Sequence, residues 1–117
     1  MKQKIPKNIS PIALNQWLEQ NSEKPLLVDV REMQELHLAT FPFSVLHIPL
    51  SKAAEMAEKF LRELDANQPV VVFCHSGIRS WNFAMWMIEQ DSECEIWNLE
   101  GGIDAWSVEI DPSVPRY

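Results

Sequence analysis

Residues 74–80 (Cys-His-Ser-Gly-Ile-Arg-Ser) combine side chains that could carry out nucleophilic chemistry. They follow a β-branched apolar run and precede a segment with helical spacing, so the thiol of Cys74 is expected beside a helix start. A helix N-terminus favours negative charge, and such surroundings lower the pKa of a cysteine from about 8.5 toward about 3.5–7.5. Because the thiolate is the reactive form, this pattern predicts that Cys74 is a nucleophile.

The other residues of this loop suit an anion held at Cys74. Gly77 permits a tight turn, with a positive φ if required, so that successive N–H groups can point inward as an anion cradle. His75 and Arg79 add one titratable and one permanently positive group, and either could bind an anionic substrate or stabilise the thiolate. The structural alternatives are an inert buried thiol for Cys74, an exposed loop residue for His75 and a surface ion pair for Arg79.

The elements around the loop must position these groups. Residues 70–73 (Val-Val-Val-Phe), bounded by Pro69, are the strongest strand candidate, and a helix is expected from about residue 79 to 90. In parallel α/β sheets, ligands bind beyond the carboxyl ends of the strands, which is where this loop is expected to lie.

Strands and helices alternate along the rest of the chain. Ser10 is the expected N-cap of the first helix, and Ser51 can cap the third. The order predicts an α/β fold with a mostly parallel sheet covered by helices on both faces. Residues 1–8 are expected to be a loose lead-in, and the tail over 112–117 is expected to be irregular. Further strands are expected over residues 25–30, 45–48 and 94–99, and further helices over 11–21, 31–38, 52–64 and 103–108.

Length, composition and charge restrict the possible functions. A chain of 117 residues with 46% hydrophobic residues indicates one globular domain over residues 1–117. The net charge of -7, without any basic run, disfavours nucleic acid as a direct partner. Neither a signal peptide nor an apolar stretch of about 20 residues is visible, so we expect no membrane partner and a cytoplasmic location. There the two cysteines would be thiols.

Several motifs, in order, make the chain resemble the rhodanese family over roughly residues 9–106. The resemblance implies a three-layer α/β fold in which a mostly parallel sheet of about five strands lies between helices. Besides the cysteine loop, the motifs are Ile-Ser-Pro at 9–11, Trp-Leu at 17–18, Leu-Val-Asp-Val-Arg-Glu at 27–32, His-Ile-Pro at 47–49 and Asn-Leu-Glu-Gly-Gly-Ile-Asp-Ala-Trp at 98–106.

The resemblance also implies an activity, sulfur transfer. Cys74 would take a sulfane sulfur from a small anionic donor such as thiosulfate, and the persulfide would pass it to a thiol, cyanide or protein acceptor. Asp29 and Arg31 match a motif whose charges are expected to brace the fold near the loop, and no cofactor is implied. The implied substrate-binding residues are His75, Ser76, Gly77, Ile78, Arg79 and Ser80.

Two other functions stay open at this stage. A cysteine phosphatase or arsenate reductase can be built on the same fold, but such phosphatases need one residue more between Cys and Arg than residues 75–78 provide. The longer spacing lets the loop wrap a tetrahedral phosphate. The other alternative is a binding or regulatory module without turnover, although inactive members of the family typically lack the cysteine.

The remaining motifs favour structural interpretations. The two cysteines are twenty positions apart, without a Cys-x-x-Cys pair or paired His spacing, so no metal site is expected. Cys94 is expected to be a packed strand residue, with a resolving thiol as the alternative. Gly101-Gly102 lacks the Lys and Ser/Thr of a phosphate loop and is interpreted as a turn into a short helix.

Overall fold

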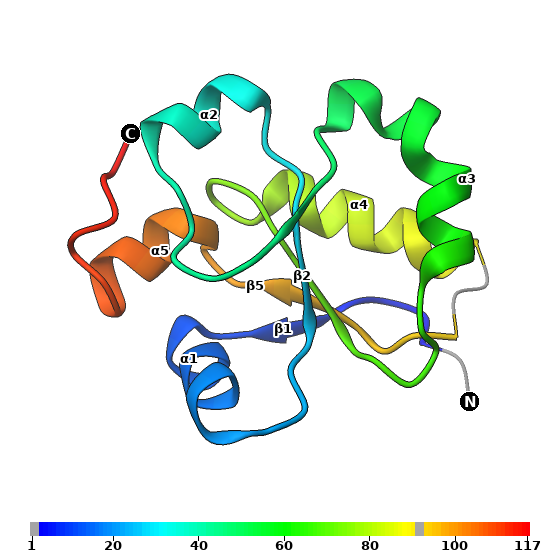
Figure 1. Cartoon of the computed structure of the whole chain (residues 1–117), viewed down its shortest axis with the longest axis horizontal. Coiled ribbons are helices and arrows are strands. Elements are labelled where there is room, and N and C mark those ends of the chain that lie inside the picture. The colour runs from blue at the N-terminus through cyan, green and yellow to red at the C-terminus, as the bar shows by residue number, and fades with distance from the viewer. Residues whose placement is uncertain (1–2, 91–92) are drawn as a thin grey trace.

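A computed structural model describes residues 3–90 and 93–117, in which a five-stranded, all-parallel sheet lies between two layers of helices (Figure 1). This confirms the predicted α/β class. The strand order is β1-β5-β4-β2-β3. The strands are β1 (Lys7–Ile9), β2 (Leu26–Asp29), β3 (Leu46–His47), β4 (Val70–Phe73) and β5 (Ile96–Leu99). The helices are α1 (Pro11–Gln20), α2 (Met33–Leu38), α3 (Ala53–Glu63), α4 (Ile78–Glu89) and α5 (Gly102–Glu109), and a 3-10 turn, η1 (Leu50–Lys52), precedes α3.

The central strand β4 contributes to two hydrophobic cores, one on each face of the sheet. Val71 and Phe73 pack into the core covered by α1 and α5, whereas Val70 and Val72 pack into the core covered by α3 and α4. All four side chains are fully buried. The continuous apolar run that predicted this strand therefore follows from burial on both faces.

Two expectations for the N-terminal half had different outcomes. The hydroxyl of Ser10 accepts a hydrogen bond from the Ala13 N–H at 3.1 Å, which confirms the predicted N-cap of α1. The expected cap at Ser51 is wrong, because α3 begins at Ala53 after the 3-10 turn. Ser51 instead donates from its hydroxyl and its N–H to the carboxylate of Glu32, the residue that caps α2.

The expected loose lead-in over residues 1–8 is wrong for Lys7 and Asn8. Both belong to β1, which pairs in parallel with β5 at the edge of the sheet. This strand has three residues, of which only Ile9 is buried. Lys and Asn are depleted in strands, so local sequence gives no strand signal, and the pairing with β5 supplies the stabilisation.

Within the described residues, no helix combines the length and the apolar character that a membrane span requires.

Candidate active site

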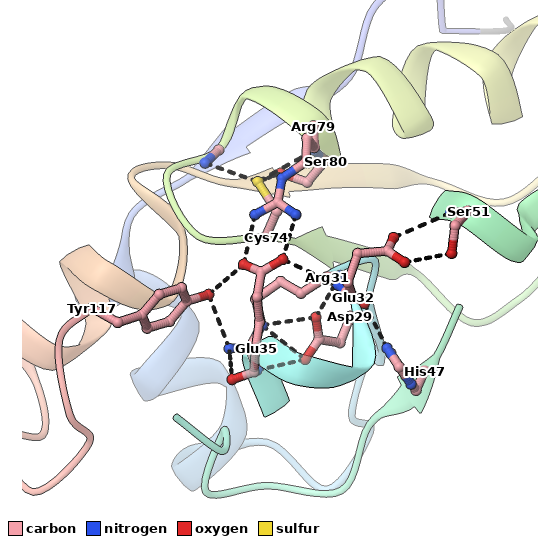
Figure 2. Close-up of polar contacts among 11 residues, drawn as sticks. Asp29, Arg31, Glu32, Glu35, His47, Ser51, Cys74, Arg79, Ser80 and Tyr117 are labelled. Atoms are coloured by element: carbon pink, nitrogen blue, oxygen red, sulfur yellow. Dashed lines mark hydrogen bonds and ion pairs between the residues drawn. The ribbon is translucent and has the colours of Figure 1, made fainter. Parts of the chain in front are cut away.

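Cys74 immediately follows β4, and the turn after it directs the start of α4 back toward its sulfur. Gly77, the N-cap of α4, has a φ of 102°, in the left-handed region that glycine adopts without steric cost. The Cys74 Sγ accepts hydrogen bonds from the N–H groups of Gly77 at 3.1 Å and Ser80 at 3.4 Å. The Ser80 hydroxyl lies 3.3 Å from the same sulfur (Figure 2). The sequence-predicted cradle is therefore present in the geometry of the loop.

These donors stabilise negative charge on a sulfur that is almost fully buried. The Cys74 residue is 1% exposed. Burial raises the pKa of the Cys74 thiol, but hydrogen bonds from the Ser80 hydroxyl and the N–H groups of Ser80, Gly77 and Ser76 outweigh burial and lower the pKa below its ordinary value. An inert buried thiol would have a raised pKa, so the hydrogen bonds distinguish Cys74 from that alternative.

The start of α5 holds the other side of the cysteine loop. The Ile103 N–H donates to the Cys74 carbonyl at 2.9 Å, and the Asp104 N–H donates to the His75 carbonyl at 3.1 Å. A Cβ atom on Gly102 would lie less than 3.0 Å from both carbonyl oxygens. The carbonyls of Cys74 and His75 thus point toward α5, and the N–H groups of Gly77 and Ser80 point toward the Cys74 sulfur. The turn predicted at residues 101–102 thus lets the backbone of α5 come close to that of the cysteine loop.

Asn98 on β5 forms hydrogen bonds to the same loop from within the sheet. Its side-chain N–H donates to the Gly77 carbonyl at 3.2 Å, and its side-chain oxygen lies 2.6 Å from the Ser80 hydroxyl, whose single hydrogen is shared between this oxygen and the Cys74 sulfur. Asn98 is 4% exposed, so these bonds are shielded from water. Sequence reasoning did not assign Asn98 to the site; a buried polar residue on a central strand is the signal that could have found it.

Arg79 forms a bidentate ion pair with Glu35 on α2. Its two terminal nitrogens lie 2.6 Å and 2.8 Å from the Glu35 carboxylate oxygens. The hydrogen bond from Arg79 holds the pKa of Glu35 at about 2, and the same bond raises the pKa of Arg79. Figure 2 shows the Arg79 side chain reaching from α4 to Glu35. The Tyr117 hydroxyl donates to the same carboxylate at 2.7 Å. Arg79 therefore ties the start of α4 to α2.

Asp29 and Arg31 form a second, fully buried ion pair. Arg31 donates to the Asp29 carboxylate at 2.8 Å, and their side chains are 0% and 1% exposed, respectively. Arg31 also donates to the Tyr117 hydroxyl at 3.2 Å, which connects this pair to Glu35 and Arg79. The two residues reach the loop through this network, which suits the bracing role expected from the sequence.

The predicted loop residues differ in whether they contact the Cys74 sulfur. Ser76, Gly77 and Ser80 surround the Cys74 sulfur, whereas Ile78 is 70% exposed. The His75 ring stacks on Tyr117, with ring centroids 4.1 Å apart. Tyr117 was missed because it belongs to the tail that the sequence predicts only as irregular, and its partners lie far away in the sequence.

Comparison with known proteins adds a family match. The rhodanese-like domain family matches residues 14–109. A putative sulfurtransferase of Bacillus subtilis is 36% identical over 106 residues, covering 91% of this chain and 95% of that protein. A thiosulfate sulfurtransferase of Glaesserella parasuis is 31% identical over 90 residues, covering 77% of this chain and 78% of that protein.

A longer relative and a solved structure extend the comparison. A rhodanese-like/PpiC domain-containing chloroplast protein of Arabidopsis thaliana is 36% identical over 92 residues, or 78% of this chain, but the match spans only 30% of that protein. The crystal structure of a rhodanese-like domain protein from Staphylococcus aureus superposes with a TM-score of 0.71 at 22% identity, covering 95% of this chain and 98% of that chain. The solved structure supports the fold alone.

Proposed function

Because the chain belongs to the rhodanese-like domain family, we propose that it is a sulfurtransferase in which Cys74 carries one sulfur atom as a persulfide. The observation that carries the proposal is the set of donors from Gly77 and Ser80 that converge on the Cys74 sulfur. The relatives described as sulfurtransferases point to the same chemistry.

In the first half of the reaction, the Cys74 thiolate attacks the sulfane sulfur of a donor such as thiosulfate. A sulfur–sulfur bond forms on Cys74, the bond between the sulfane sulfur and the sulfonyl sulfur breaks, and sulfite leaves with the electron pair. The lowered pKa of Cys74 supports this step because it raises the thiolate fraction at neutral pH. The negative charge that the persulfide then carries is of the kind that main-chain N–H groups stabilise.

In the second half, the thiolate of an acceptor, or cyanide, attacks the outer sulfur of the persulfide. The new bond forms to the acceptor, the sulfur–sulfur bond on Cys74 breaks, and the electron pair returns to Cys74 as thiolate. The cradle then holds the same anion as at the start. Pre-oriented donors of this kind need no rearrangement while charge moves between the two sulfur atoms.

Intact-mass analysis after mixing the protein with thiosulfate tests this proposal. We expect a gain of one sulfur atom in the wild-type protein and none in a Cys74→Ala variant. A Cys94→Ala variant should keep the gain, because Cys94 is the matched second cysteine and lies outside the loop. A wild-type protein without the added sulfur would contradict the proposal and favour a binding module, whereas hydrolysis of phosphate esters would favour a phosphatase.

A further inference from the structure

Helices α3 and α4 cover one face of the sheet (Figure 1). An apolar groove runs between them. Its volume is about 400 Å³, and one wall comes from η1 and α3 and the other from α4. The side chains that the argument uses are Leu50, Ala54 and Ala57 on the first wall and Arg79, Phe83 and Trp86 on the second.

One end of the groove is formed by Arg79, in the first turn of the helix whose start donates to the Cys74 sulfur. Arg79, Phe83 and Trp86 are four and three residues apart, so they form one stripe along α4 that starts in its first turn. The residue after Arg79 is Ser80, whose N–H and hydroxyl lie 3.4 Å and 3.3 Å from the Cys74 sulfur. Arg79, which lines the groove, is also close enough to Cys74 for their charges to interact, so this end of the groove lies near the reactive sulfur.

The charge at that end of the groove favours an uncharged occupant. Arg79 is the charged residue among the described residues of the lining, and both of its terminal nitrogens are bound to Glu35. Because the Glu35 carboxylate, with a pKa of about 2, is ionised at neutral pH, it neutralises the charge of Arg79, and this end of the groove has no net positive charge to attract an anion. An apolar chain can bury its surface against the alanines, Phe83 and Trp86 without breaking the ion pair.

We propose that this groove binds the apolar arm of a small thiol that accepts sulfur from the Cys74 persulfide. The proposal rests on the function proposed above and adds a substrate class to it. The acceptor thiolate attacks the outer sulfur, its carbon-bound sulfur gains the new bond, and Cys74 leaves as thiolate. The product is the persulfide of the acceptor, whose arm stays in the groove during the transfer.

Single-turnover transfer to a series of acceptors tests the groove. The wild-type protein is loaded with thiosulfate, freed of excess donor and mixed with mercaptopropanol, mercaptobutanol or mercaptohexanol, whose thiols have similar acidity. At acceptor concentrations well below saturation, the transfer rate should rise with chain length, by up to about fourfold for each methylene group that becomes fully buried. Equal rates for the three acceptors would overturn the groove proposal alone, whereas failure to load Cys74 would overturn the proposed function as well.

Two charge substitutions place the effect in the groove. Ala54→Glu puts a carboxylate at the exposed edge of the groove, and it should abolish the preference for mercaptohexanol over mercaptopropanol. Ala13→Glu makes the same change at an exposed position of α1, on the opposite face of the sheet, and should retain the wild-type preference. Equal chain-length preferences in the two variants would show that the arm lies elsewhere.

Discussion

The two cysteines have similar burial but opposite surroundings. Cys74 is 1% exposed and Cys94 is 6% exposed, and both belong to the core under α3 and α4. The Cys74 sulfur accepts hydrogen bonds from main-chain N–H groups, whereas the Cys94 sulfur donates to the Asp65 carbonyl at 3.3 Å. Burial is thus similar at the two sulfur atoms, and at Cys74 the donated hydrogen bonds stabilise negative charge in spite of it.

The direction of the strands explains this difference. Cys74 follows the carboxyl end of β4, where the chain turns into α4, so free N–H groups of the helix start face it. Cys94 precedes β5 and therefore lies near the amino ends of the parallel strands. Cys74 therefore meets main-chain donors at the carboxyl ends of the strands, and Cys94 meets a carbonyl acceptor near their amino ends.

The largest expected effect comes from Gly102→Ala, which should disturb the surroundings of Cys74 and leave those of Cys94 intact. The new Cβ would meet the carbonyls of Cys74 and His75, and the φ of 62° disfavours alanine. We expect a loss of at least about 2 kcal/mol in the free energy of unfolding, measured by urea denaturation, and slower alkylation of Cys74.

Gly101→Ala is the matched control for this substitution. Gly101 has a φ of 77°, so alanine is strained there too, but its Cβ would meet Ala105 rather than the cysteine loop. It should lower stability with a smaller effect on the alkylation of Cys74. Equal slowing in both variants would mean that α5 does not orient the loop.

Ser80→Ala should have an intermediate effect, because it removes one donor from the Cys74 sulfur. The hydrogen bond from the Ser80 hydroxyl contributes most to lowering the pKa of Cys74, so its loss should raise that pKa. Alkylation of Cys74 at neutral pH should slow several-fold, and the free energy of unfolding should fall by about 1 kcal/mol because the hydrogen bonding of this hydroxyl to Cys74 and Asn98 is lost. In the exposed control Ser76→Ala the main-chain donor stays, so an alkylation rate as slow as that of Ser80→Ala would contradict this role of the hydroxyl.

The smallest expected effect is that of Glu35→Gln, which weakens the tie between α2 and α4. The pKa of Glu35 is lowered from 4.5 to about 2 by Arg79, so its contribution to stability is fully present above pH 4.5 and disappears as the pH falls toward 2. Urea denaturation should show a loss of about 1 kcal/mol at neutral pH that vanishes in acid. Glu63→Gln, in an exposed ion pair with Lys59, should cost less stability at neutral pH; an equal loss in the two variants would contradict the account.

The sequence predicted the parts of the site that are local in the chain. The β-branched run before Cys74 and the helical spacing after Gly77 place this cysteine at a helix start, and both features depend on neighbouring residues. Ser10 as an N-cap is equally local. The alternation of strands and helices was sufficient for the parallel sheet, since parallel strands need crossover connections.

The features that the sequence did not predict depend on distant partners. Glu35 and Arg79 are 44 positions apart, and Tyr117 is 82 positions from Glu35. Asn98 reaches Gly77 and Ser80 only because β5 lies beside β4. Residue type and spacing in one sequence do not indicate which charged or polar groups meet across such distances.

The pH dependence of alkylation at each cysteine tests most directly whether the loop donors stabilise a thiolate. Peptide mass analysis after short exposure to iodoacetamide gives a separate rate for Cys74 and Cys94 in the same protein. The account predicts that the rate at Cys74 reaches half of its maximum below the ordinary thiol pKa of about 8.5 and exceeds the rate at Cys94 at neutral pH. A midpoint for Cys74 at or above that value would contradict it.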